Sequence, residues 1–166
     1  MTTFQKQNTE DCCPIFRPEK WDNKTFNWKN KPFIKDSVPA LFHIPSKKML
    51  NKKITRMVKE AEFSNKLEKN KEDVLLLFAD PNPFKSNIYL SVTGKVPNLN
   101  NTELSGTFIA KVFDGQYKSI PKFLKQMNIL LKKQNKKVKT HYIHYAYCPK
   151  CAKTYGNNYM VLFAKV

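Results

Sequence analysis

The same order of predicted elements occurs twice along this chain, and that repeat constrains the fold more than any other feature of its sequence. In the second half, residues 104–113 form an apolar, β-rich segment that predicts a strand, and residues 120–131 are apolar at helical spacing. Residues 140–147 and 159–166 predict two further strands, joined by a loop that holds Gly156. This half therefore has the order strand, helix, strand, strand.

The first half has the same order. Residues 32–44 predict a strand, and Ser46 caps a helix that carries one apolar stripe. Residues 74–79 and 87–93 predict the next two strands. Two β-α-β-β units at a spacing of about seventy residues predict an α+β fold with pseudo-twofold symmetry, in which an antiparallel sheet packs against two main helices.

The repeat also sets the expected domain organisation. Neither unit could bury a sheet face alone, so residues 32–166 are expected to form one domain from two repeats, about 32–94 and 102–166. Residues 1–31 would form an N-terminal extension. The interface between the repeats is the natural place for a groove.

The segment LSGTFIAKVFDGQYKSIPKFLKQMNILLKK, residues 104–133, contains a strand, a turn with Gly115 and Tyr117, and an amphipathic helix. With the tandem architecture, it resembles the GyrI-like small-molecule-binding family, also known as effector-binding domains. The sequences DCCPIF near the start and YCPKC near the end are similar to a stand-alone branch of that family. The resemblance implies a groove between the repeats that binds flat or amphipathic organic molecules. Some members of the family are hydrolases that open strained rings in toxic alkylating natural products.

The chain departs from the family pattern in two ways that bear on function. No helix-turn-helix precedes the domain, so a one-chain transcription regulator is not expected. The predicted strand at residues 159–166 contains no carboxylate, whereas the family commonly places a glutamate there facing the ligand.

Aromatic side chains are the candidates for a ligand groove. Large rings with polar tips suit a pocket for planar ligands, although the same rings could simply fill the core between sheet and helices. Strand alternation places Tyr142 and His144 on one face and Ile143 and Tyr145 on the other, so some of these rings are expected to be ordinary packing. The predicted groove residues are Trp21, Trp28, Tyr89, Tyr142, His144 and Tyr159.

Four cysteines form the second candidate site. The two-residue gap between Cys148 and Cys151 lets both thiolates reach one tetrahedral Zn²⁺, and Cys12 and Cys13 could complete its ligands. His144 is a further candidate ligand. A redox pair is the alternative, but such pairs begin a helix after a strand, whereas here a hairpin tip is predicted. Ordinary reduced thiols are the third interpretation.

The charge of the chain is large but uninformative about partners. The 30 Lys and Arg residues against 13 Asp and Glu residues give a formal net charge of +17. Only Arg17 and Arg56 are arginines, and the lysines are dispersed, so specific recognition of nucleic acid is not expected. Carboxylates are scarce, and no complete catalytic constellation or nucleotide-binding loop is present, so whether the chain is an enzyme stays open.

The sequence contains no apolar run long enough to span a membrane, and residues 1–11 lack the apolar core of a signal peptide. A cytoplasmic protein, monomer or dimer, is therefore expected. We expect its function to be the binding of a small apolar or planar organic molecule between the repeats, for sensing, sequestration or detoxification. One alternative is a hydrolase of reactive xenobiotics in the same groove, and a second is nucleic-acid or acidic-partner binding through a lysine-rich surface.

Overall fold

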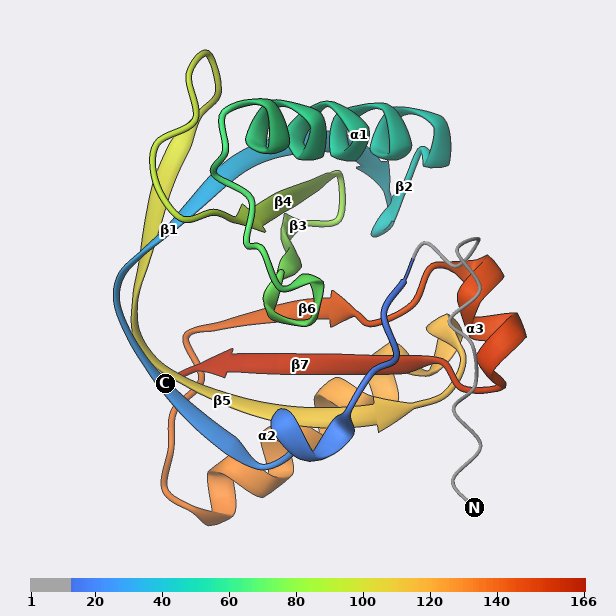
Figure 1. The fold of residues 1–166 in the computed structure, drawn as a ribbon. Helices are drawn as coiled ribbons and strands as arrows, with labels where there is room; N and C mark the ends of the chain where they lie inside the picture. Colours follow the sequence, from blue (N-terminus) through green and yellow to red (C-terminus); the bar gives the residue numbers. More distant parts are fainter. Residues whose placement is uncertain (1–12) are drawn as a thin grey trace, which may run out of the picture.

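A closed antiparallel barrel forms the centre of the computed structural model, which describes residues 13–166 (Figure 1). Six strands follow one another around the barrel, and pairing between the first and last of them closes the ring. A seventh, two-residue strand, β2 (Ile44–Pro45), pairs with the end of the first strand. The order around the ring is β1 (Lys24–Leu41), β4 (Lys85–Ser91), β3 (Leu76–Asn82), β6 (Thr140–Tyr145), β7 (Tyr159–Lys165) and β5 (Asn101–Asp114).

The two halves of the chain contribute equally to this ring. The first half supplies β1, β4 and β3 in that spatial order, and the second supplies β5, β7 and β6. In each half one long helix lies between the first and second of the ring strands in sequence, which confirms the predicted element order and the antiparallel sheet. The pairings β1–β5 and β3–β6 then join the halves on both sides, a closure that the predicted repeat did not include.

Aromatic side chains fill the inside of the barrel. Because successive residues of a strand point to opposite faces, Phe33 on β1 faces inward while its neighbour Ile34 faces outward. Phe108 and Phe163, from strands of the second half, pack in the same interior cluster, and all three phenylalanines are fully buried. The interior is therefore a packed core.

Two helices cover the outside of the barrel, at the top and the bottom of Figure 1. Helix α1 (Lys47–Phe63) buries Met57 and Ala61 against strands of the first half. Helix α2 (Ile120–Lys133) buries Phe123, Met127 and Leu131 against strands of the second half. These residues belong to the two apolar stripes expected from the sequence, so both predicted helices are confirmed.

Strand β1 begins at Lys24, well before the predicted start at residue 32, because its first residues pair with β5 from Lys24 opposite Ala110. A bulge between Trp28 and Lys31 bends it. Gly106, opposite Trp28, has a φ of +132°, and a Cβ there would lie 2.9 Å from the Lys165 side chain. Only glycine adopts this backbone conformation without strain.

The predicted hairpin tip between β6 and β7 is wrong, because a third helix, α3 (Pro149–Tyr155), occupies this connection. Cys148 is its N-cap residue and Pro149 its first helical residue, a position where proline loses no hydrogen bond. Gly156 ends the helix with a φ of 76°. Residues 13–166 also contain three short 3₁₀ helices: η1 (Pro18–Lys20), η2 (Lys71–Asp73) and η3 (Tyr117–Ser119). No helix in the described part of the chain is long and apolar enough to cross a membrane.

Candidate functional site

A cleft of about 370 Å³ lies between the N-terminal segment, defined as residues 13–21, and the barrel wall. Its other walls come from α1, from the connection around η2, and from strands β3 and β6 with the residue that follows β6. Apolar side chains form most of the surface: Pro14, Ile15, Phe16, Trp21, Val58, Leu67, Val74, Leu76 and Ala146. Groups that can carry charge or accept a proton share the same space: Cys13, Arg17, Lys20, Glu62, Lys71, Glu72 and His144.

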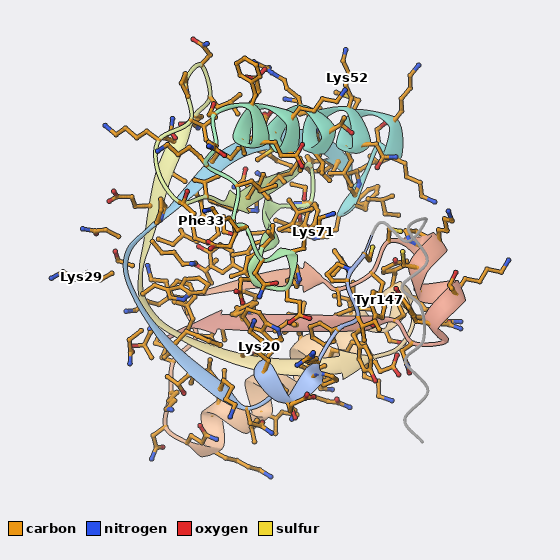
Figure 2. All side chains as sticks on the ribbon, in the orientation of Figure 1. Lys20, Lys29, Phe33, Lys52, Lys71 and Tyr147 are labelled. Atoms are coloured by element: carbon orange, nitrogen blue, oxygen red, sulfur yellow. The ribbon has the colours of Figure 1, made fainter. Side chains whose placement is uncertain are left out.

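Ion pairs join the N-terminal segment to η2 across the cleft. The Arg17 Nε lies 3.9 Å from a carboxylate oxygen of Glu72, and Lys20 forms an ion pair with Asp73 (Figure 2 labels Lys20). These pairs are partly exposed, so each stabilises the segment by about 1 kcal/mol at most. Glu72 is half-buried, whereas Glu62 is exposed. Glu72 is thus the carboxylate of this cleft that is better shielded from water.

His144 provides an uncharged group beside the cleft. Its Nδ1 lies 3.2 Å from both the backbone nitrogen and the carbonyl oxygen of Leu76. Burial lowers the pKa of His144 to about 4, and the hydrogen bond with the Leu76 backbone only partly opposes that effect. The imidazole is therefore neutral at neutral pH, and Nδ1 either donates to the carbonyl or accepts from the amide, according to the tautomer.

The predicted groove residues fall into separate places. Trp21 and His144 line the cleft. Trp28 lies in the barrel interior, where its ring centroid is 4.2 Å from that of Phe108. Tyr159 packs beside the N-terminal segment, with its ring centroid 5.2 Å from that of Phe16.

Tyr89 and Tyr142, the remaining predicted groove residues, are brought together inside the barrel. Their ring centroids are 5.7 Å apart in an edge-to-face arrangement, and both side chains are buried. Burial, with a smaller contribution from the neighbouring Tyr89, raises the pKa of Tyr142. Both of these residues and Trp28 belong to the interior cluster that also contains Phe33.

Three of the four predicted metal ligands meet at one end of the N-terminal segment. The Sγ atoms of Cys13, Cys148 and Cys151 all lie within 4.8 Å of one another, so these residues could hold a metal ion. Cys12 lies outside the described residues. Among the residues that the structure does describe, the cluster contains no histidine, so His144 is not one of its members.

Two tyrosines that are not among the predicted groove residues hold the N-terminal segment beside the cysteines. The amide nitrogen of Phe16 donates a hydrogen bond of 2.9 Å to the hydroxyl of Tyr147 (labelled in Figure 2). The hydroxyl of Tyr155 donates one of 3.2 Å to the carbonyl oxygen of Cys13. Glu72 was also missed, because nothing in its local sequence places it opposite residues far earlier in the chain.

Comparison with known proteins gives a family. The sequence model of a family described as bacterial hydrolase matches residues 3–166, nearly the whole chain, and the chain belongs to that family. No curated protein matches the chain.

Proposed function

We propose that this member of the bacterial hydrolase family binds a small organic molecule in the cleft beside the N-terminal segment and hydrolyses it there. The composition of the cleft carries the proposal, because apolar walls surround a half-buried carboxylate and a neutral imidazole. Ligand sites generally have this character, with a mostly apolar surface and a few polar groups that fix the orientation of the ligand.

The dimensions and chemistry of the cleft favour a substrate with an apolar or planar body. Its volume of about 370 Å³ falls within the range of small-molecule sites, about 300–1,000 Å³. Phe16 and Trp21 offer ring surfaces for such a body. Arg17 and Lys20 already form ion pairs with Glu72 and Asp73, and Lys71 adds a further cation to the lining. A cation at this place favours a substrate that becomes negatively charged during the reaction.

We assign the activation of water to Glu72. Hydrolysis requires a group that accepts a proton from water, and a carboxylate shielded in a cleft can serve as that group. The ion pair with Arg17 limits the orientation of this carboxylate. His144, being uncharged, would orient the substrate through a hydrogen bond rather than through charge.

Binding without turnover is the second candidate, in line with the resemblance to the GyrI-like family. The observation that favours it is Trp21, whose large ring lines the cleft and also packs against Phe163 of the barrel interior. A ring fixed in this way offers a rigid surface for a flat ligand with little loss of side-chain entropy.

The test measures hydrolysis of a panel of aryl esters and strained-ring alkylating compounds by the wild-type chain, the Glu72→Gln variant and the Glu103→Gln variant. Glu103 is an exposed residue of β5 that does not line the cleft, so it is a matched control for the loss of one carboxylate. We expect Glu72→Gln to lower kcat/KM by about 100-fold or more, the usual contribution of general-base catalysis, and Glu103→Gln to leave it unchanged.

Two results would count against the proposal, the first against hydrolysis and the second against the role of Glu72. If a compound of the panel raises the melting temperature of the wild-type chain, and mass spectrometry shows that this compound stays intact, binding without turnover is the function. If Glu72→Gln retains full activity, Glu72 is not the base.

A further inference from the structure

We propose that the thiolates of Cys13, Cys148 and Cys151 bind one Zn²⁺ ion, which fastens the N-terminal segment to the end of the barrel. The mutual separation of the three sulfur atoms is the first observation, since all lie within 4.8 Å of one another. A tetrahedral zinc ion with Zn–S bonds of about 2.3 Å holds its sulfur ligands about 3.8 Å apart. The cluster is therefore compatible with such a site.

The fold gives the three cysteines defined places. Cys148 is the N-cap of α3, and Cys151 lies one turn further along, so the two-residue spacing turns both side chains towards one point. Cys13 arrives from the opposite end of the sequence. The backbone nitrogen of Cys148 donates a hydrogen bond of 3.4 Å to the Cys13 Sγ, which is the kind of outer contact that steadies a thiolate ligand.

The chemistry of the cluster selects the type of metal. Its ligands are soft sulfur atoms, which favour Zn²⁺ over hard ions such as Mg²⁺ and Ca²⁺ that prefer oxygen. The three thiols lose their protons to solvent when the ion binds, leaving a centre with one net negative charge. The exposed lysines 150 and 153 on α3 carry the opposite charge nearby.

The burial of the three cysteines distinguishes this site from a chance group of surface thiols. Cys151 is 1% exposed, and Cys13 and Cys148 are half-buried. A fourth ligand completes a tetrahedron, and a water molecule would fill that position.

The position of the site gives it a consequence for the cleft. Cys13 both belongs to the sulfur cluster and lines the cleft. Two hydrogen bonds hold the same stretch of chain. Tyr155 donates one to the carbonyl oxygen of Cys13, and the amide of Phe16 donates the other to Tyr147. A bound zinc ion would therefore fix one wall of the cleft, whether or not the cleft hydrolyses a substrate.

The experiment measures the metal content of the full-length chain, purified with reduced thiols and without chelator, by native mass spectrometry and elemental analysis. We expect about one zinc ion per chain, lost after treatment with a chelator and recovered on addition of zinc. The Cys13→Ser, Cys148→Ser and Cys151→Ser variants should each lose it. Lys150→Ser, which changes an exposed residue between two of the ligands, should keep it.

A second measurement keeps the proposal testable if a cysteine variant fails to fold. Replacement of zinc by Co²⁺ in the wild-type chain should give visible absorption bands of tetrahedral thiolate coordination, together with sulfur-to-metal charge transfer in the near ultraviolet. Failure of the reduced wild-type chain to take up either metal would overturn the proposal. Full zinc content in the Cys13→Ser variant would equally overturn it, because the N-terminal segment would not be a ligand. Neither result depends on whether the chain is a hydrolase.

Discussion

Replacement of Phe33 by alanine should destabilise the barrel more than any exposed substitution of the same kind. Phe33 is fully buried inside the barrel, with its ring centroid 5.9 Å from that of Trp28 and 6.4 Å from that of Tyr89. Figure 2 labels it within the ring of strands. Removing a buried phenylalanine side chain costs about 3–5 kcal/mol, since apolar contacts are lost and a cavity remains. For a chain of this size, that cost lowers the melting temperature by roughly 6–20 °C.

Phe63→Ala is the matched control, because Phe63 at the end of α1 is 92% exposed and the same atoms are removed. We expect its free energy of unfolding to stay within about 0.5 kcal/mol of the wild-type value. The free energy is measured by urea denaturation with far-ultraviolet circular dichroism as the signal. Tryptophan fluorescence is avoided because Trp28 lies beside the replaced side chain. If Phe33→Ala lowers the free energy of unfolding by less than about 1 kcal/mol, the interior is not tightly packed. The surrounding aromatic residues would then be candidates for an open ligand groove, as expected from the sequence.

Three further predictions concern pH, backbone and metal. Burial lowers the pKa of His144 to about 4 in the folded chain, whereas the ordinary value is 6.5, so below pH 6.5 the unfolded chain binds a proton that the folded chain does not. Stability should be full above pH 6.5 and fall by up to about 3 kcal/mol towards pH 4, and His144→Asn should remove this part of the pH dependence in urea titrations. Gly106→Ala should cost about 1–3 kcal/mol by thermal unfolding, because φ is +132° there; Gly94→Ala, at ordinary φ, should cost less, and equal losses would contradict the argument. Chelation of zinc under reducing conditions should speed tryptic cleavage after Lys20, observed by mass spectrometry, and an unchanged rate would show that metal does not hold the N-terminal segment.

The parts of the fold that depend on local periodicity could be predicted from the sequence. Phe123, Met127 and Leu131 recur at helical spacing because one face of α2 packs on the barrel. The start of β1 was missed, because Phe26 and Trp28 alternate with polar residues over only a short stretch, and pairing with the distant strand β5 holds that stretch in place. Helix α3 was missed because two turns give too short a pattern to distinguish a helix from a loop.

One part of the candidate site could be predicted from the sequence, and another part could not. The spacing of Cys148 and Cys151, with a further cysteine pair near the start, was enough to predict a sulfur cluster, and the structure brings Cys13 to it. The cleft could not be predicted, because its walls come from segments that only the closed barrel places side by side. Glu72 meets Arg17 through that closure, and no local pattern encodes such a contact.

The closure of the ring also bears on how the chain folds during its synthesis. Strand β3 pairs with β4 and β6, and β5 pairs with β1 and β7. Before β6 and β7 emerge, the earlier strands can form only an open sheet, with β3 and β5 as unprotected edges and the aromatic inner face exposed to water. Open edges beside apolar surface favour association between incomplete chains. Arrival of the last two strands removes both edges at once, so protection of the nascent chain from aggregation depends on the end of the sequence rather than on its beginning.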